Sequence, residues 1–422
     1  MVKLERSLSL WEVTLMGVGV ILGAGIYVII GQATEITGNS IWLSFIIGAI
    51  VASFTGLSYA ELSSRFPKSG AEYVYIKDSF GNKFAWLVGW LIIAGNVIAA
   101  ATVAKGFSHY FSALFNTPIL LVALVLIIIC GIILILGVKE TATVTIFFTA
   151  IEIIGLIIVI FVGLPRLGQV NYLELVNGTK GLIEAGVLIF FAYLGFQGIT
   201  RLSEETKNPE KNIPKAIILS ILITTIIYIL VGISAVSVIP WSELASSQAP
   251  LALVAQHIFG DQSFVILSVI ALFSTFNTAL MMLLCGSRLV FGIAEEKAIP
   301  SIFSRVSKKT LSPWFAIMWI TVAASLFLFI GDLKTIANLT NFTIFTAFIF
   351  VNSSVIYFRY KKPVKKGFRV PLSVGKFPII PLLGIITSIF MIVNLSFNIL
   401  LMGFILIVIG VVFDIILDIK YE

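Results

Sequence analysis

The chain has 422 residues, of which 59% are hydrophobic and 12% charged, with a formal net charge of +7 at pH 7. An ordinary soluble domain is about half apolar and about a quarter charged, so this composition excludes a soluble globular protein. The two cysteines, Cys130 and Cys285, lie inside apolar runs, which favours buried thiols over a disulfide framework or a zinc site.

Apolar runs long enough to cross a bilayer recur along the whole chain, since about 20 residues at ~1.5 Å each cover ~30 Å of hydrocarbon. No long Ser/Gly/Pro-rich linker divides them, so we expect residues 1–422 to form a single transmembrane domain. The runs predict an all-α polytopic membrane protein with twelve transmembrane helices, at residues 10–35, 41–63, 84–104, 118–137, 143–164, 181–200, 214–238, 262–287, 313–331, 335–358, 377–396 and 399–418.

The positions of lysine and arginine predict the orientation. With the N-terminus inside, 24 of the 28 lie in inner segments, and only Lys105, Arg166, Lys180 and Lys334 lie on the other side. The positive-inside rule then places both termini in the cytoplasm of a cell (plasma or inner) membrane. The same split accounts for the net charge without a nucleic-acid partner. The basic cluster at 359–369 is interpreted as a topology determinant facing anionic lipid.

Small residues interrupt the first span near its middle, where Gly17, Gly19, Gly23, Ala24 and Gly25 come together. The sixth span has a similar mixture of aromatic and small residues at 190–196. Because a helix in lipid must satisfy its own backbone hydrogen bonds, such clusters at the midplane predict broken helices. The alternative interpretation is close helix packing through small residues.

The two predicted breaks occupy matching positions if residues 1–164 and 181–358 are two five-helix units that each begin with the broken helix. An odd number of spans inverts the second unit, giving an inverted repeat with its binding site at the midplane. Residues 377–418 would then be two peripheral helices.

Broken helices offer backbone groups that suit a zwitterion. Free N–H groups at the start of a half-helix attract a carboxylate, and unwound carbonyls attract an ammonium group or a small cation. The aromatic residues Phe191, Tyr193 and Phe196 would cover the substrate or stack on its ammonium.

Five stretches, in order between residue 9 and about residue 390, resemble the amino acid, polyamine and organocation (APC) transporter superfamily. They are SLWEVTLMGVGVILGAGIYVIIGQA from Ser9, YAELSSRFPKSGAEYVYIKDSFG from Tyr59, FFAYLGFQGITRLSEETKNPEKNIPKAI from Phe190, SRLVFGIAEEKAIP from Ser287 and FRVPL from Phe368. The resemblance implies the LeuT-type fold, with ten helices in two inverted repeats and two peripheral helices, and the activity of an amino acid permease.

The resemblance also implies the substrate-binding residues. The substrate carboxylate would meet the backbone of Gly23, Ala24 and Gly25, with Ile26 next to them. The amino group would meet carbonyls in the second break, which contributes Phe191, Ala192, Tyr193, Leu194 and Gly195. The position of Gln197 is acidic in many relatives, which puts a proton-sensing gate there in doubt. Exchangers of this superfamily that are linked to a heavy chain carry a cysteine in the loop after the third helix. None lies in residues 105–117, so we expect no disulfide-linked partner and a monomer or homodimer in the bilayer.

Glu152 is an isolated carboxyl group near the centre of the fifth span. Placing it there costs at least ~2.5–3.5 kcal/mol, so it is a functional candidate by default. Burial favours the neutral, protonated form, which would let Glu152 carry a proton across the membrane. A purely structural glutamate, hydrogen-bonded to a neighbouring helix, is the alternative.

The coupling ion stays open between two possibilities, and no other cofactor is expected. The first is a proton on Glu152. The second is sodium, held by the Glu152 carboxylate with oxygens from Ser274, Asn277 and Thr278 of the eighth span. In several proton-coupled members of the superfamily that this chain resembles, the position of Glu152 is a lysine. Glutamate there gives the opposite sign of charge.

Other polar residues carry weaker signals. Asn96, Asn338 and Asn341 would line the pocket or bond between helices, Lys105 would snorkel to the surface, and His109 and His257 would face solvent in outer loops.

Amino acid uptake or exchange is the preferred function. Polyamine antiport ranks lower because the spans lack a cluster of carboxylates. An amino acid sensor without net transport would be expected to carry a longer cytoplasmic tail than the few residues outside the predicted spans. A membrane enzyme is disfavoured because no nucleophile and base, metal cluster or phosphate loop can be assembled within the spans.

Overall fold

The computed structural model describes residues 6, 8–66, 71–136, 142–203, 205–296, 298–307, 310, 312–362 and 367–421. The α-helices are α1 (Leu10–Thr37), α2 (Ile41–Arg65), α3 (Ala71–Phe80), α4 (Asn82–Phe115), α5 (Ile119–Ile135), α6 (Ala142–Gly163), α7 (Gly178–Ile189), α8 (Pro209–Val238), α9 (Trp241–Ser246), α10 (Pro250–Phe259), α11 (Asp261–Glu295), α12 (Trp314–Phe327), α13 (Leu333–Lys361), α14 (Ile379–Val393) and α15 (Phe397–Tyr421). Short 3-10 helices are η1 (Gly38–Ser40), η2 (Leu164–Arg166), η3 (Phe190–Tyr193), η4 (Phe196–Leu202) and η5 (Ser301–Ser304), and β1 (Ser373–Val374) pairs antiparallel with β2 (Phe377–Pro378).

Local sequence signals explain where several helices begin and end. Ser9 and Glu12 form a reciprocal capping box at the start of α1, which satisfies two backbone N–H groups that the first turn leaves free. Asp332 caps α13 by accepting a hydrogen bond from the Thr335 N–H at 2.9 Å. Asn116 ends α4 in the left-handed conformation that asparagine tolerates better than most residues.

Each predicted span overlaps a helical segment, and eight stretches of the described chain are long and apolar enough to cross a bilayer. Four shorter apolar helices accompany them: α5, α10, α12 and α14. The helix of the third predicted span, α4, continues past residue 104 to Phe115. This extension brings Lys105 and His109 into a helix, so the prediction that His109 lies in an outer loop is wrong.

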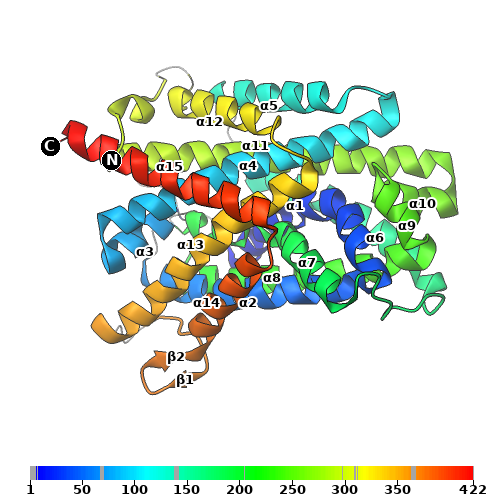
Figure 1. The fold of residues 1–422 in the computed structure, drawn as a ribbon, viewed down its shortest axis with the longest axis horizontal. Helices are drawn as coiled ribbons and strands as arrows, with labels where there is room; N and C mark the ends of the chain where they lie inside the picture. Colours follow the sequence, from blue (N-terminus) through cyan, green and yellow to red (C-terminus); the bar gives the residue numbers. More distant parts are fainter. Residues whose placement is uncertain are drawn as a thin grey trace.

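The helices are arranged around α1, which contacts α6, α7, α8, α9 and α11. Figure 1 shows α4, α5, α11 and α12 together on one side of the molecule, with α2, α7 and α8 on the other side of α1. The most extensive helix contacts are those of α4 with α11 and of α2 with α8. α14 packs on α13 and α2, and α15 packs on α4 and α13 at the periphery.

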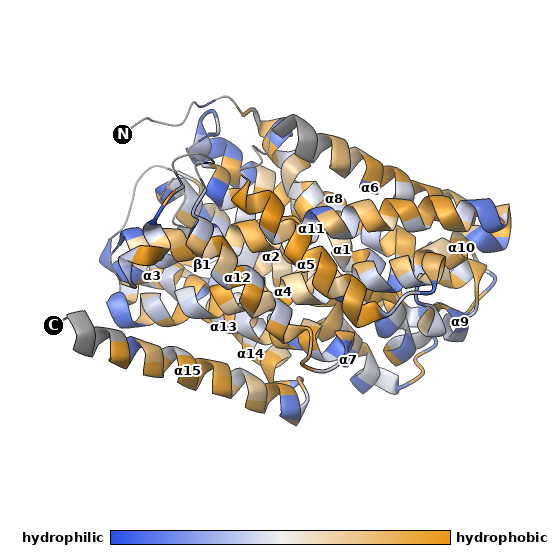
Figure 2. Cartoon of the chain, turned by 90° about the horizontal axis from the view of Figure 1, so that it is seen from above, coloured by the Kyte–Doolittle hydropathy of each residue, from blue (hydrophilic) through white to orange (hydrophobic). Residues whose placement is uncertain are grey.

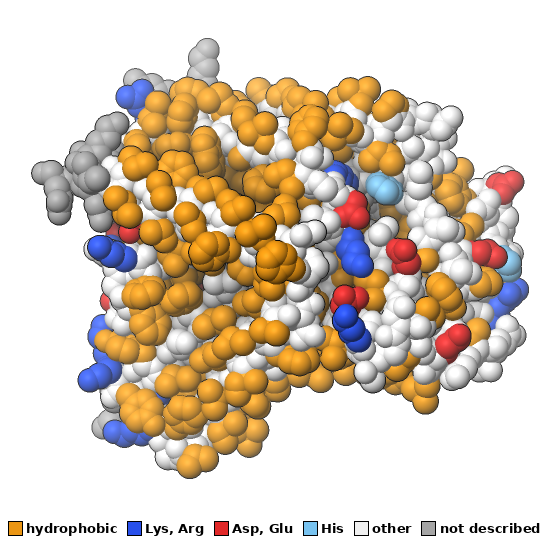
Figure 3. Space-filling model, in the orientation of Figure 1, with side chains coloured by type: hydrophobic (Ala, Val, Ile, Leu, Met, Phe, Trp, Pro, Cys, Tyr) orange, Lys and Arg blue, Asp and Glu red, His pale blue; other side chains and the backbone are white. Residues whose placement is uncertain are grey.

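Apolar side chains cover much of the outer surface. Figure 2 shows them along the middle of the helices, with hydrophilic residues gathered toward the two ends of the molecule. On the face drawn in Figure 3, a row of lysine and arginine side chains lines the left edge, where the end of α15 also lies in Figure 1, and the right half carries both acidic and basic side chains. This is the surface expected of a protein that crosses a bilayer.

The basic cluster at 359–369 contains a residue with a packing role. Arg359 makes two hydrogen bonds to the carboxylate of Glu61, one of them from Nε to Oε1 at 2.8 Å. Both side chains are largely buried, and Glu61 also accepts from the Val370 N–H at 2.7 Å. Arg359 therefore joins α13 to α2 rather than facing lipid headgroups, because the bidentate geometry of its guanidinium matches a carboxylate.

Two backbone hydrogen bonds fasten the residue before the capping box of α1 to the segment after η4. The Leu8 N–H donates to the Glu205 carbonyl at 3.0 Å, and the Lys207 N–H donates to the Leu8 carbonyl at 2.8 Å. We call this pairing the Leu8 bridge.

Candidate functional site

The first interruption lies at Gly23, where the backbone of α1 leaves helical geometry (φ −25°, ψ −140°). The hydroxyl of Thr278 on α11 accepts a hydrogen bond from the Ala24 N–H at 2.9 Å and donates to the Ser274 carbonyl at 2.9 Å. A Cβ on Gly23 would lie 2.2 Å from the Thr278 hydroxyl oxygen. The absence of a side chain at Gly23 therefore allows α11 to cap the exposed backbone of α1.

The second interruption follows α7. After η3, Leu194 is extended (φ −61°, ψ 142°) and Gly195 has φ 120°, a conformation that strongly favours glycine. The Gly195 N–H donates to the side-chain oxygen of Gln197 at 3.1 Å. Five of the predicted binding residues, Phe191, Ala192, Tyr193, Leu194 and Gly195, thus lie within or beside a real break and are buried or nearly so.

The two interruptions touch each other. A Cβ on Gly25 would lie 2.4 Å from the Cα of Ala192, and a Cβ on Gly195 would lie 2.6 Å from Val20 Cγ1. Only glycine permits backbones to approach this closely. The predicted residues of the two breaks therefore lie against each other, as a ligand bound by backbone groups from both helices requires.

Tyr228 of α8, which the sequence analysis did not single out, joins both breaks. Its hydroxyl oxygen lies 2.6 Å from the Ile21 carbonyl and 2.8 Å from the Ala192 carbonyl. A hydroxyl has one proton, so it donates fully to only one of them at a time. In the sequence, Tyr228 is marked only as a lone tyrosine within the apolar run TTIIYILVG.

Tyr193 lies in the second break, but its side chain makes contacts away from the first break. Its hydroxyl donates to the Phe45 carbonyl of α2 at 3.0 Å, and its ring packs edge-on against Tyr228 with centroids 5.3 Å apart. Phe196 packs against Tyr59 and Phe348. In this conformation, then, Tyr193 ties the break to α2.

The predicted coupling residues lie together. Glu152 on α6 is 1% exposed, and the side chains of Ser274 and Asn277 on α11 lie beside its carboxyl group. Among the described residues, no hydrogen-bond partner lies within normal distance of either oxygen of the Glu152 carboxyl group. The same is true of the Ser274 hydroxyl. Buried polar groups without partners are costly and therefore rare, so a proton or a cation on this carboxyl would remove an energetic penalty.

This coupling cluster is connected to the first break. Ser274, Asn277 and Thr278 are three and four residues apart and so share one face of α11. On the other side, the Tyr27 hydroxyl of α1 donates to the backbone carbonyl of Glu152 at 3.0 Å. α1 is thus joined to α6 at the backbone of Glu152 by Tyr27, and by Thr278 to the face of α11 that carries Ser274 and Asn277.

Two of the asparagines predicted to line the pocket or to bond between helices, Asn341 and Asn96, make different hydrogen bonds. The Asn341 side chain donates to the Val187 carbonyl at 2.7 Å and joins α13 to α7. Asn96 donates to the Ile92 carbonyl of its own helix. Asn341 therefore bonds between helices, one of its two predicted roles.

Together, the apolar helices and the two touching helix breaks define the class of multi-pass membrane transporters. Comparison with known proteins specifies the family. The amino acid permease family matches residues 8–412 of the chain. The protein belongs to this family, and the resemblance to the APC superfamily is confirmed.

Several relatives align over most of the chain. The branched-chain amino acid permease BcaP of Bacillus subtilis is 29% identical over 97% of this chain and 92% of its own length. The methylthioribose transporter of Bacillus subtilis is 32% identical over 90% of this chain and 87% of its own. The vacuolar cationic amino acid transporter 4 of Arabidopsis thaliana is 30% identical over 86% of this chain and 64% of its own. All three are named as transporters or permeases.

Proposed function

We propose that this protein is a secondary active amino acid transporter that binds its substrate between the two broken helices and works by alternating access. The observation that carries the proposal is the direct contact of the two breaks at Gly25 and Ala192. The N–H groups after Gly23 suit the substrate carboxylate, and the carbonyls of Phe191, Ala192 and Leu194 suit its ammonium group. On binding, the substrate would take the place of the Thr278 hydroxyl at the Ala24 N–H and of the Tyr228 hydroxyl at the Ala192 carbonyl. Specificity for the side chain of the substrate comes from the residues that surround the two helix breaks.

In the architecture that we propose, twelve helices cross the membrane and residues 1–164 and 181–358 form two inverted repeats. The packing supports this arrangement, since each of the first four helices contacts its counterpart in the second unit. These pairs are α2 with α8, α4 with α11, α5 with α12, and α1 with the interrupted stretch from α7 to η4. Paired contacts of this kind follow from a pseudo-two-fold axis in the membrane plane.

The orientation has both termini in the cytoplasm of a cell membrane. The support is the surplus of lysine and arginine on the predicted inner side, together with the row of these side chains along the left edge of the molecule in Figure 3. Positive residues flanking the spans are retained on the cytoplasmic side.

Proton coupling through Glu152 is the mechanism that we favour. A buried carboxyl with few partners is strongly penalised when charged and much less when neutral. Protonation from one side would make Glu152 neutral, and the Thr278 and Tyr27 contacts would pass the change to α1. Sodium bound by Glu152 with oxygens from Ser274, Asn277 and Thr278 is the second candidate.

Amino acids are the substrate class that most of the named relatives support. The relative named for methylthioribose adds a second class that a substrate screen must include. Polyamines are less favoured as substrates, because the predicted spans lack a cluster of carboxylates.

The test is uptake into liposomes containing the purified protein. Radiolabelled amino acids and methylthioribose are screened with proton and sodium gradients imposed separately, using Glu152→Gln and, as a matched control on an exposed glutamate, Glu35→Gln. We expect uptake driven by an inward proton gradient, and a Glu152→Gln protein that still binds and exchanges amino acid but loses the pH dependence.

Other outcomes separate the alternatives. A sodium requirement would make Glu152 a cation ligand. Flux only against preloaded amino acid, unaffected by Glu152→Gln, would indicate an exchanger with a structural glutamate. Binding without any flux would indicate a sensor and contradict the proposal.

A further inference from the structure

A cavity lies away from the helix breaks, between α1, α4, α5 and the start of α13. Its volume is about 430 Å³, within the ~300–1,000 Å³ range of small-molecule sites. It contains Lys105, and it lies at the end of the helices that the charge distribution places outside the cell. The residues of the helix breaks are not among those that line it.

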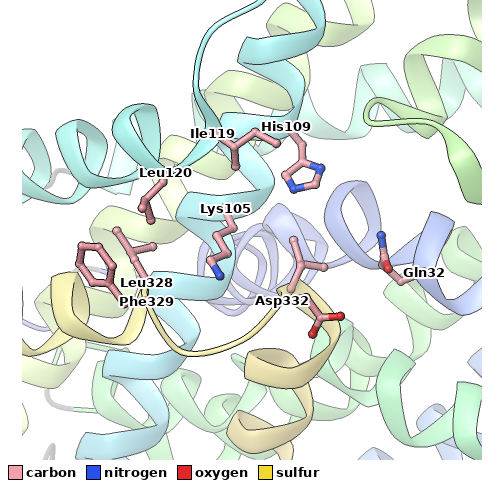
Figure 4. Close-up of a pocket in the computed structure, with 9 residues that line it drawn as sticks. Gln32, Lys105, His109, Ile119, Leu120, Leu328, Phe329 and Asp332 are labelled. Atoms are coloured by element: carbon pink, nitrogen blue, oxygen red, sulfur yellow. The ribbon is translucent and has the colours of Figure 1, made fainter.

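The polar groups of this cavity carry both signs of charge. Lys105 and His109 of α4, Gln32 of α1 and Asp332 of the α13 cap line it, and Figure 4 shows their polar ends gathered around one part of the space. The Lys105 side chain is 8% exposed, and its ammonium group donates to the Gly331 carbonyl. A buried ammonium that keeps this fixed position is pre-organised to receive a carboxylate.

Asp332 supplies the opposite charge. Its Oδ1 atom accepts the capping hydrogen bond from the Thr335 N–H, so the loop holds the carboxylate in place. Lys105 reaches the same loop, because its ammonium group donates to the carbonyl of Gly331, the residue before Asp332. A ligand that carries an ammonium and a carboxylate group on one carbon would satisfy both residues.

The rest of the cavity is apolar. Ile119 and Leu120 of α5, with Leu328 and Phe329 after α12, line it. Figure 4 shows these side chains on the opposite side of the space from Asp332 and Gln32. The cavity therefore offers a charged head-group region beside an apolar one.

We propose that this cavity is a separate outer binding site for an amino acid with an apolar side chain, occupied before the substrate reaches the helix breaks. Lys105, assisted by His109, binds the carboxylate, Asp332 binds the ammonium group, and the residues of α5 and Leu328–Phe329 contact the side chain. The inference rests on the proposed amino acid transport for the identity of its ligand, and it adds a site that the helix breaks do not require.

The experiment measures protection of a thiol placed in this cavity. Leu120→Cys is labelled from outside with a membrane-impermeant maleimide, with and without leucine, and the chain without the added cysteine gives the background from Cys130 and Cys285. We expect leucine to slow labelling, and 4-methylpentanoate and 3-methylbutylamine, which each lack one charged group, to protect much less.

Asp332→Asn in the Leu120→Cys protein is the decisive variant, since asparagine keeps the capping acceptor and removes the charge. We expect the half-protecting leucine concentration to rise about tenfold or more, as for loss of a charged hydrogen bond. Lys334→Gln, which removes a nearby charge outside the cavity lining, should leave it within twofold. Lys105→Gln should weaken protection, and Lys105→Arg should retain most of it.

Protection that survives Asp332→Asn would come from a rearrangement caused by binding elsewhere and would overturn the proposal. Absence of protection in a protein that transports leucine would overturn it as well. The assay needs no transport. A protein that shows charge-dependent protection without uptake would retain the outer site and refute only the transport proposal.

Discussion

At the scale of single residues, two hydroxyl groups hold the broken helices in place. Thr278 satisfies the backbone N–H released by the break at Gly23, and Tyr228 reaches a carbonyl on each side of the site. Both bonds are buried, where an unsatisfied backbone group is expensive. The helix breaks therefore depend on side chains from α11 and α8 that adjoin them.

Tyr228→Phe should lower stability. The substitution removes the hydroxyl and leaves the Ile21 and Ala192 carbonyls without it, at a cost of about 1–3 kcal/mol. The measurement is thermal unfolding in detergent, compared with Tyr360→Phe on an exposed ring of α13. Equal unfolding temperatures for the two variants would show that the Tyr228 hydroxyl does not stabilise the breaks.

The residue scale also shows what the sequence can and cannot predict. Small residues near the middle of a span locate both breaks, as a glycine cluster in the first and among aromatic residues in the second, because the chemistry of an interrupted helix is local. Tyr228 is marked only as a lone tyrosine in an apolar run, and its role cannot be predicted from that because it depends on carbonyls 207 and 36 residues away in sequence. Nothing local indicates that α4 continues through His109 to Phe115, and the partner that draws Arg359 away from lipid, Glu61, is 298 residues distant.

At the scale of helices, glycines decide how closely the elements approach. Gly25 has the Ala192 backbone against it, whereas a Cβ added to Gly292 on α11 would have no atom within 4 Å. These two glycines therefore serve different purposes: Gly25 is required by contact, while Gly292 is free to accept a larger residue.

Gly25→Ala should separate the two breaks and reduce uptake at least about tenfold, since overpacking against backbone typically costs ~1–3 kcal/mol. Gly292→Ala should transport normally, with stability equal to or slightly above that of the unchanged protein because alanine favours helix by about 1 kcal/mol. Initial uptake rates per folded protein, with folding checked by size-exclusion chromatography, make the comparison. Normal uptake by the Gly25 variant would refute a site built on this contact.

At the scale of the whole molecule, the helix order and approximate bounds follow from hydrophobic runs, because long apolar segments have few alternatives in a membrane. The sequence does not predict the Leu8 bridge, since backbone pairing between residues 8 and 205–207 leaves no mark in side-chain composition. This bridge fastens the first half of α1 to the chain after η4, at the Lys/Arg-rich end that is proposed to face the cytoplasm.

Leu8→Pro should weaken the bridge, because proline removes the N–H that donates to Glu205. Leu8→Ala keeps that N–H and is the matched control. We expect maleimide labelling of Cys285, which is half-buried beside Arg201 of η4, to be about two- to tenfold faster in the proline variant, as one hydrogen bond allows. Equal labelling of the proline and alanine variants would show that the bridge does not restrain this side.

The Leu8 bridge is made only of neutral amide groups. An electric field across the membrane does work on charge that moves through it, about 2.3 kcal/mol per elementary charge for each 100 mV. Breaking these two hydrogen bonds transfers no charge, and the Glu205 and Lys207 side chains of the same segment carry opposite charges, so voltage exerts little net force on the bridge. In the mechanism that we propose, any electrical sensitivity of transport would then enter through charged groups such as Glu152, or through the substrate and its coupling ion.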